Sequence, residues 1–305
     1  MQIFITGGSG YVGTALSRHF LAGGHSVTAV GTRPVHEVIS PDGFRYLPAD
    51  TSVPGDWQAT AAEADVIVNL AGKGIFKRWS RRYKTAIYDS RVLTTRLIAD
   101  ALPDDSSGVV LLSTSAVGYY GSRGEAALTE SAAPGDDFLA RVGVDWEAAT
   151  TGAAQKGARV VLARFGVVLS AGGGAMARMM PAFRSGLGGP IGSGKQWFPW
   201  IHLTDLIAAI GFLLSRPDAE GPFNFCAPEP VRQGDFARRL GSRLNRPAIL
   251  PAPAAMMRLI LGEFADTLLS SQRVIPERLD EMGFSFQYPD IDTALDEIAA
   301  QAKGE

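Results

Sequence analysis

The sequence predicts an α/β fold of the Rossmann type, a doubly wound parallel sheet with a smaller C-terminal substrate lobe. Two observations lead to this prediction. Short apolar runs alternate with helical patterns through the first half of the chain, which is typical of a parallel sheet covered by helices. In addition, a glycine-rich phrase at residues 6–13 directly follows the first apolar run and opens a helical pattern.

The strand-like runs occupy residues 2–5, 26–31, 44–48, 65–70, 108–113 and 158–164. Those at 65–70 and 108–113 are apolar almost throughout, which predicts central strands buried on both faces. Ligands of such sheets bind outside the carboxyl ends of the strands. We therefore expect one crevice to be lined by Asp50, by residues 69–72 (Asn69, Leu70, Ala71 and Gly72), by residues 113–115 (Ser113, Thr114 and Ser115) and by Arg164.

The glycine-rich phrase is typical of a dinucleotide-binding turn. Gly7, Gly10 and Gly13 let the backbone turn sharply and approach a pyrophosphate, and the following helix offers unpaired N–H groups at its N-terminus. Glycines also mark ordinary turns, but here a strand-like run precedes them and an amphipathic helix follows. We expect these glycines to bind the cofactor together with Tyr11 and Val12, which lie between them.

After about residue 165 the alternating pattern gives way to glycine-rich loops at 172–174 and 186–194. We expect residues 1–165 with 194–226 to form the dinucleotide-binding Rossmann domain. Residues 166–193 with 227–305 would then form the substrate and C-terminal lobe. Apolar residues at helical spacing near the end of the chain, such as Met256 and Leu259, are interpreted as core.

Composition excludes several classes of function. The 29 basic and 31 acidic residues give a net charge of −2, so nothing indicates a nucleic-acid partner. The single cysteine, Cys226, and scattered histidines predict no metal site. The chain starts in its first strand and has no apolar run of about 18 residues, so we expect no membrane partner and a cytoplasmic location. A monomer or a homodimer is expected.

Several ordered phrases together resemble the extended short-chain dehydrogenase/reductases. Within that group, the phrases are most similar to those of the epimerase family oxidoreductases. These proteins resemble NAD-dependent epimerases and dehydratases and are sometimes labelled cell-division-inhibitor-like. The phrases lie at residues 69–72, 78–79, 90–92, 113–121, 146–149, 188–194, 200–202 and 271–276. The resemblance covers essentially the whole chain, including a C-terminal segment from about 247 that is similar to this family's own domain of unknown function. It implies a nicotinamide cofactor.

The end of the second strand predicts which nicotinamide cofactor is bound. Arg33 lies twenty residues after Gly13, where NAD-binding folds usually place an acidic residue on the ribose 2′-hydroxyl. A guanidinium can pair with a 2′-phosphate, and Thr32 adds a hydroxyl, so the sequence predicts NADP(H). The alternative is a solvated arginine. Asp50 would accept from the adenine amino group or cap a helix.

The usual catalytic pair of the resembled family, Tyr-x-x-x-Lys on a helix, is absent. In the helix where the resemblance places it, counting back from Glu147 gives Gly143 and Leu139, which can do neither job. The candidate catalytic residues are instead Ser115, Tyr119 and Tyr120. The alternative is that one tyrosine packs against the cofactor or substrate while the other anchors its loop through its hydroxyl.

Six basic residues and no acid lie between residues 73 and 84. We expect Lys73 and Arg78 to contact the cofactor phosphates or an anionic substrate, and the others to be solvated. His202 and Asp205 are interpreted as structural groups at a helix start rather than as bases.

Two functions follow. The first is an NADP(H)-binding oxidoreductase acting on an unknown small carbonyl, alcohol or nucleotide-sugar-like substrate. The second is a non-catalytic NADPH sensor or regulatory protein.

Overall fold

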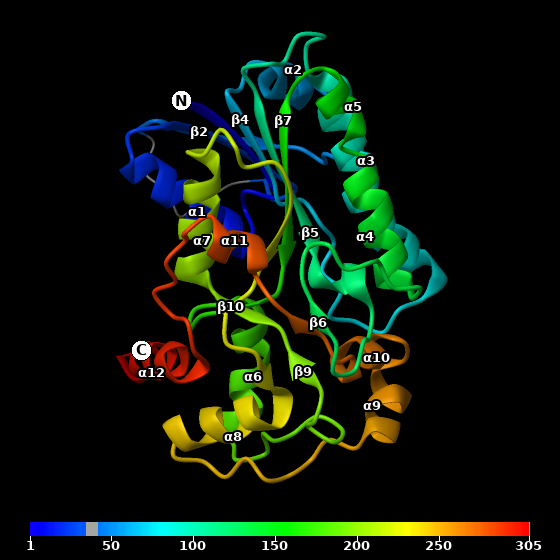
Figure 1. Ribbon diagram of the computed structural model, residues 1–305, viewed down its shortest axis with the longest axis vertical. Coiled ribbons are helices and arrows are strands. Elements are labelled where there is room, and N and C mark those ends of the chain that lie inside the picture. The colour runs from blue at the N-terminus through cyan, green and yellow to red at the C-terminus, as the bar shows by residue number, and fades with distance from the viewer. Residues whose placement is uncertain (35–41, 305) are drawn as a thin grey trace.

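A seven-stranded parallel sheet forms the centre of the molecule, in the strand order β11-β7-β5-β4-β1-β2-β3 (Figure 1). The computed structural model describes residues 1–34 and 42–304. The six predicted strand regions are confirmed, and the sheet adds one edge strand that was not predicted. The strands are β1 (Gln2–Thr6), β2 (Ser26–Gly31), β3 (Phe44–Pro48), β4 (Val66–Asn69), β5 (Val110–Ala116), β7 (Arg159–Phe165) and β11 (Gly221–Phe225).

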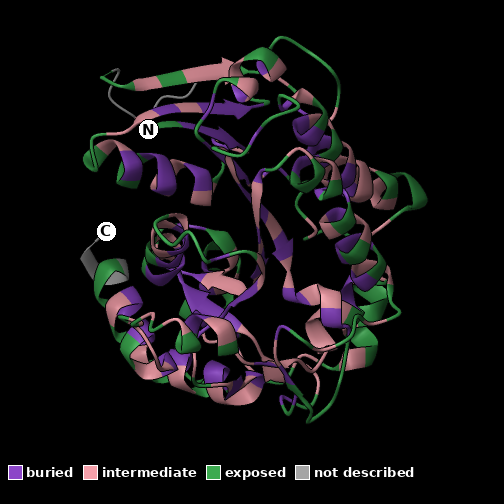
Figure 2. Ribbon diagram, turned by 45° about the horizontal axis from the view of Figure 1, so that its top comes forward, coloured by how far each residue is buried: buried purple, intermediate pink, exposed green. Residues whose placement is uncertain are grey.

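Helices cover both faces of this sheet, as Figure 1 shows. One face carries α1 (Tyr11–Ala22) and α7 (Leu203–Leu214), and the other carries α2 (Trp57–Ala62), α3 (Arg81–Ala101), α4 (Phe138–Ala148) and α5 (Thr151–Gln155). Along β1, Ile3 and Ile5 are buried in the cluster with α1 and α7, while Phe4 is buried in the opposite cluster with α2 and α3. Burial on both faces explains why the strands are continuous apolar runs. In Figure 2 the strands are accordingly mostly buried between the helical layers.

A second buried cluster lies in the smaller lobe below the sheet in Figure 1 and contains Met176, Phe183, Trp200, Phe236 and Leu295. Outside the central sheet, six short strands form three pairs: β8 with β10, β9 with β12 and β6 with β13. The short strands are β6 (Ala127–Leu128), β8 (Val167–Leu169), β9 (Trp197–Phe198), β10 (Trp200–His202), β12 (Val231–Arg232) and β13 (Arg273–Val274). The remaining helices are η1 (Val117–Tyr120), α6 (Gly174–Arg184), α8 (Gln233–Arg243), α9 (Ala254–Leu261), α10 (Phe264–Leu269), α11 (Glu277–Glu281) and α12 (Ile291–Gly304).

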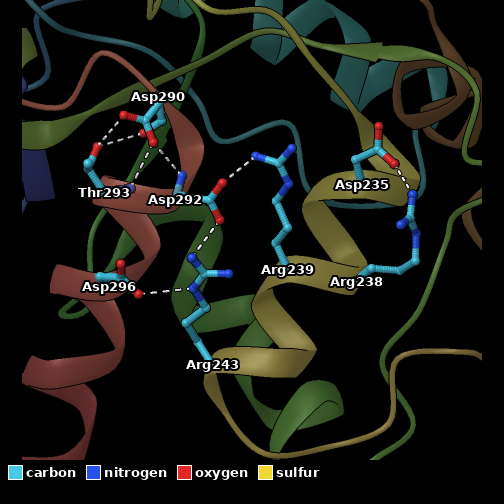
Figure 3. Close-up of polar contacts among 8 residues, drawn as sticks. All are labelled: Asp235, Arg238, Arg239, Arg243, Asp290, Asp292, Thr293 and Asp296. Atoms are coloured by element: carbon cyan, nitrogen blue, oxygen red, sulfur yellow. Dashed lines mark hydrogen bonds and ion pairs between the residues drawn. The ribbon is translucent and has the colours of Figure 1, made fainter.

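The C-terminal helix α12 is docked on α8 by charged and apolar contacts (Figure 3). Arg243 bridges to Asp292 at 2.5 Å and to Asp296 at 3.0 Å, and Arg239 adds a 2.7 Å contact to Asp292. These carboxylates are exposed, so each ion pair contributes only about 0–1 kcal/mol. The apolar seam between the two helices, where Leu240 packs in the same buried cluster as Leu295, therefore provides most of the attachment.

His202 and Asp205 hold the start of α7. The His202 Nδ1 accepts from the Thr204 amide at 3.3 Å as the helix cap, and its Nε2 lies 3.2 Å from the Glu297 carboxylate. The Asp205 carboxylate accepts from the amides of Gln287 (2.7 Å) and Tyr288 (2.9 Å). Burial lowers the pKa of His202 and raises the pKa of Asp205. These contacts tie α7 to the C-terminal segment, in agreement with the structural interpretation of both residues.

The prediction that the apolar residues of α9 belong to the core is wrong. No residue of α9 is buried, and Leu259 and Ile260 are 75% and 58% exposed. This short helix packs mainly against α10, so most of its surface has no protein partner among the described residues. Helical spacing of apolar residues identifies a helix, but it does not show how many of its sides are covered.

Candidate cofactor and active site

The turn between β1 and α1 is too tightly packed for any residue but glycine at two positions. Gly7 has a φ of +66°, and a Cβ there would lie 2.7 Å from the Leu70 carbonyl oxygen. A Cβ at Gly13 would lie 2.6 Å from the Gly7 oxygen. The glycine turn therefore lies directly against the carboxyl end of β4, where Leu70 and Ala71 follow the strand.

The N-terminus of α1 is left open by the sequence. Gly10 is the cap residue and has no side chain to bond the first amides, and the hydrogen-bond ladder begins with the Thr14 amide donating to the Gly10 oxygen at 2.9 Å. The amides of residues 11–13 have no helical carbonyl to bond. A close backbone turn followed by free amides at the positive end of a helix suits a pyrophosphate, so these residues fit a dinucleotide.

Tyr11 and Val12 have side chains engaged elsewhere. The Tyr11 hydroxyl forms a hydrogen bond with Ser170, and a Cβ at Gly173 would lie 2.4 Å from the Tyr11 ring. The ring is thus packed against a loop that leads into α6 of the second lobe. Val12 packs on the cluster beneath α1. At these two positions the main chain, rather than the side chain, faces the candidate pyrophosphate site.

The carboxyl end of β2 lies beside the glycine turn, because the Gly8 amide donates to the Val30 oxygen at 2.9 Å. Thr32 and Arg33 follow and are exposed, and the Arg33 carbonyl accepts from the Tyr46 hydroxyl at 2.8 Å. The structure therefore brings the predicted 2′-phosphate residues to the edge of the predicted pyrophosphate site.

Asp50, at the end of β3, is exposed and turns back on its own loop. Its carboxylate accepts from the Ser52 amide at 2.9 Å and from the Ser52 hydroxyl at 2.6 Å. The alternative that Asp50 caps a helix is wrong, because α2 begins after Asp56. Its proposed contact with adenine stays a prediction.

Asn69, rather than Ser113, organises the carboxyl edge of the central strands. Its Oδ1 accepts from the Thr6 hydroxyl at 2.6 Å, and its Nδ2 donates to Thr95 (2.8 Å) and to Ser113 (3.3 Å). All four side chains are buried. Ser113 was expected to bind the cofactor, but its burial gives it a supporting role, locking β5 to β4 beneath the site.

Arg91 is a site residue that was not among the predicted ones. It lies on α3 under Gly72, where a Cβ would come within 3.1 Å of its guanidinium carbon. Its guanidinium donates to the carbonyls of Lys73 and Ile87, both at 3.0 Å, and burial lowers the pKa of Arg91 to about 10. Residues 90–92, one of the phrases that carry the family resemblance, were the sequence feature that could have identified Arg91. The main chain of Lys73 is thereby fixed, while its side chain is exposed.

Arg78 does not reach the glycine turn in this arrangement. Its guanidinium donates to the Leu259 carbonyl at 3.3 Å, and its side chain packs against Gly262. The segment after Gly72 crosses to the second lobe, so Arg78 links that segment to the end of α9. Its expected contact with the cofactor phosphates stays a prediction.

Ser115 and Glu147 form the polar centre at the end of β5. The Ser115 hydroxyl donates to Glu147 Oε1 at 2.7 Å, and Arg164 binds the same carboxylate through Nε and Nη2, both at 2.8 Å. Ser115 is 1% exposed, whereas the Glu147 side chain keeps 11% of its surface exposed. Glu147 was not predicted, and its pairing with Ser115 joins residues that are 32 positions apart.

Arg164 was expected to contact the cofactor, but its guanidinium is used inside the protein. Besides Glu147, it donates to the Tyr120 hydroxyl at 2.8 Å and to the Glu130 carbonyl at 3.1 Å. Burial by itself would lower the pKa of Arg164, but hydrogen bonds and charge from Glu147 and Tyr120 outweigh it and raise that pKa. Arg164 therefore remains charged and holds the Glu147 carboxylate in place.

Tyr120 is fully buried, so it cannot meet a substrate. Its hydroxyl donates to Asn224 Oδ1 at 2.7 Å and accepts from Arg164. Burial raises the pKa of Tyr120 to about 12, even though the charge of Arg164 acts in the opposite direction. The structure therefore supports the alternative that one tyrosine anchors the loop through its hydroxyl, and removes Tyr120 from the catalytic candidates.

Tyr119 occupies the space above Gly143. A Cβ at Gly143 would lie 3.3–3.5 Å from the Cα, Cβ and ring of Tyr119, and the Tyr119 ring covers the Arg164 guanidinium at 3.7 Å. Gly143 is one helical turn before Glu147 on α4, where the usual pair was sought. The half-buried Tyr119 thus lies next to the Glu147–Arg164 pair. It comes from η1, whereas the usual catalytic tyrosine would come from α4.

Two surface hollows lie away from these residues. One of about 470 Å³ is lined by Glu125, Pro190, Ser193, Gly194, Lys195, Arg232, Gly234, Asp235 and Arg238. The other, of about 400 Å³, is lined by Trp79, Arg81, Lys84, Thr85, Tyr88, Phe138 and Glu263. Within the described ranges, no three His, Cys, Asp or Glu side chains gather as a metal site, and no helix is long and apolar enough to cross a membrane.

Comparison with known proteins gives two family matches. Residues 3–226 match the NAD dependent epimerase/dehydratase family, and residues 252–298 match a domain of unknown function. The first range contains the whole seven-stranded sheet and the site described above, and the second contains α9, α10, α11 and much of α12.

Relatives cover nearly the full chain. The epimerase family protein Mb2239 of Mycobacterium bovis is 40% identical over 96% of both chains. A chloroplastic homologue of the epimerase family protein SDR39U1 from Arabidopsis thaliana is 38% identical over 97% of this chain and 86% of its own. A crystal structure of human SDR39U1 (isoform 2) with NADPH superposes with a TM-score of 0.85, at 35% identity over 98% of this chain and 99% of its own.

Proposed function

This chain belongs to the NAD-dependent epimerase/dehydratase family, and from that membership we propose that it is an NADP(H)-dependent oxidoreductase of the extended short-chain type. Its substrate is a small carbonyl, alcohol or nucleotide-sugar-like molecule. The balanced charge of the chain supports a small-molecule substrate rather than nucleic acid. The protein acts as a monomer or homodimer in the cytoplasm.

The glycine turn is the observation that supports this proposal most directly. Gly7, Gly10 and Gly13, with the free amides at the start of α1, would hold the pyrophosphate, and Thr32 and Arg33 would hold a 2′-phosphate. The NADPH of the human relative, at 35% identity, supports the same choice of cofactor. When bound, NADP(H) supplies the hydride donor or acceptor.

The reacting end would lie where β5 ends. Asn69 pairs with Ser113 across β4 and β5, and Ser115 lies two residues further along the same strand. Ser115, Glu147 and Tyr119 therefore form a polar cluster at the sheet edge that also carries the glycine turn. Tyr119 offers the half-buried hydroxyl of this cluster, and Ser115 fixes the position of the Glu147 carboxylate.

The test follows NADPH absorbance with a panel of ketones, aldehydes, quinones and keto-sugars, and NADP⁺ with the matching alcohols. Wild type is compared with a Ser115→Ala/Tyr119→Phe double variant, and NADPH affinity is measured for both by fluorescence. Turnover by wild type that the double variant loses, with NADPH affinity kept within about threefold, is the expected result. Turnover that is unchanged in the double variant would contradict the placement of the reacting end.

A non-catalytic NADPH sensor is the second candidate. The observation that favours it is the replacement of the usual Tyr–Lys pair, since Gly143 and Glu147 stand one turn apart on α4 where that pair was sought. Tight NADPH binding without turnover of any member of the panel would support the sensor and contradict the oxidoreductase.

A further inference from the structure

Glu147 has one hydrogen-bonding position that the protein leaves open. Its Oε1 accepts two hydrogen bonds, from Ser115 and from Arg164 Nε, while its Oε2 accepts only from Arg164 Nη2. Each carboxylate oxygen can accept about two hydrogen bonds, so one lone pair of Oε2 is unused by the described residues. The Glu147 side chain keeps 11% of its surface exposed.

The position of this carboxylate is fixed by its surroundings. Arg164 of β7 binds it from one side through two hydrogen bonds of 2.8 Å. Tyr119 and Tyr120 of η1 cover and bond Arg164, so they act on Glu147 through it. On the side of α3, Tyr88 and Arg91 pack against the neighbouring Asp145 and Trp146. A carboxylate held in this way has its oxygens available only as acceptors for a ligand.

Ser115 points its only hydroxyl hydrogen at Glu147, so it cannot at the same time donate to a carbonyl. In the described arrangement no group of the Ser115–Glu147–Arg164 set is placed to protonate a substrate oxygen, but Glu147 is placed to accept a hydrogen bond. A ligand that bonds to Glu147 therefore brings its own donor. A hydroxyl is the donor that an alcohol or a sugar offers.

We propose that Glu147 is the proton acceptor of this site, replacing the absent Tyr–Lys pair, and that the substrate presents a hydroxyl to Glu147 Oε2. This inference rests on the proposed function. The hydroxyl O–H bond breaks and its proton forms an O–H bond on Oε2. The carbinol carbon loses its hydride to NADP⁺, the oxidant, so that the alcohol becomes a carbonyl. Ser115 and Arg164 are positioning residues that hold the carboxylate.

The test compares Glu147→Gln with Glu130→Gln as a matched control. Glu130 is a second buried carboxylate of the same region, whose Oε1 accepts from the Asn224 amide at 2.9 Å and whose carbonyl accepts from Arg164. It makes no contact with Ser115 in the described structure. NADP⁺-dependent oxidation of a panel of secondary alcohols, hydroxy acids and sugars is measured from acid to neutral pH, with NADP⁺ affinity and thermal unfolding measured on the same samples.

We expect Glu147→Gln to lower kcat by about 100-fold or more, the usual contribution of a positioned acid–base group. NADP⁺ affinity should stay within about threefold. Glu130→Gln should keep the wild-type kcat and pH profile. Glu147→Asp, which keeps a carboxylate one methylene short of its partners, should keep a measurable rate below that of wild type. It serves as the test if Glu147→Gln does not fold.

Three results would overturn the inference alone. One is a Glu147→Gln enzyme with a wild-type rate and pH profile, and another is an equal loss in Glu130→Gln. The third is a wild type that reduces carbonyls but oxidises none of the hydroxyl compounds. Failure of wild type to turn over any alcohol or carbonyl, despite binding NADP(H), would instead overturn the proposed function and this inference with it.

Discussion

Replacing Gly13 by alanine tests whether the glycine turn binds the cofactor. The added Cβ would lie 2.6 Å from the Gly7 oxygen, 2.7 Å from the Gly8 Cα and 2.9 Å from the Gly8 oxygen. Carbon atoms in ordinary contact are about 3.5–4.0 Å apart, so the turn and α1 must separate by about 1 Å. All three atoms belong to the backbone of the turn, so no side-chain rotation can relieve the contact.

The expected cost follows from that displacement. Overpacking of this kind destabilises folded proteins by about 1–3 kcal/mol, and the strain falls on the backbone that would bind the pyrophosphate. Since 1.4 kcal/mol is a factor of ten, NADPH affinity should fall by about tenfold or more. Fluorescence titration with NADPH and thermal unfolding measure the two effects. Gly108→Ala is the control, because a Cβ there meets nothing within 4 Å.

A Gly13→Ala variant that binds NADPH within twofold of wild type would refute the reasoning. Weaker binding in Gly108→Ala to the same extent would do so as well, because it would show that the effect does not depend on the turn.

Further predictions concern the cofactor and the stability of the fold. Arg33→Ala should weaken the binding of NADPH by about tenfold, because one charged hydrogen bond at an exposed site is lost, and it should leave the binding of NADH unchanged. Equal weakening of NADPH and NADH binding, measured by titration, would remove the assignment of Arg33. Asp205→Ala should lower the free energy of unfolding in urea by about 2–3 kcal/mol, because it leaves the amides of Gln287 and Tyr288 without their acceptor, and an unchanged urea midpoint would contradict this. Burial lowers the pKa of His202, so the unfolded chain binds its proton first and stability should fall as the pH drops below about 6.5. His202→Asn, which can still cap α7, should flatten this part of the pH dependence of thermal unfolding, and a curve parallel to wild type would count against the assignment.

The structure of the sheet was predictable from residues near one another in the chain. Strands buried on both faces are apolar at most positions, so the burial of Val66–Asn69 and its neighbours is visible in the local sequence. The glycine turn is also local, because its spacing reflects contacts between Gly7 and Gly13. The lack of a Tyr–Lys pair could be read directly from the sequence for the same reason.

The chemistry of the site depends on contacts between distant residues and could not be read in this way. Nothing near Glu147 in the sequence indicates that Ser115 and Arg164 converge on it, because β5, β7 and α4 are brought together only when the sheet and its helices pack. The same packing buries Tyr120 and leaves Leu259 exposed, although both are hydrophobic residues in helical segments. Local patterns in the chain thus predict a nucleotide-binding Rossmann sheet without the usual catalytic pair. Which charged groups stand at the edge of that sheet follows from the packing of its layers, because burial and pairing are properties of the assembled layers rather than of any one segment.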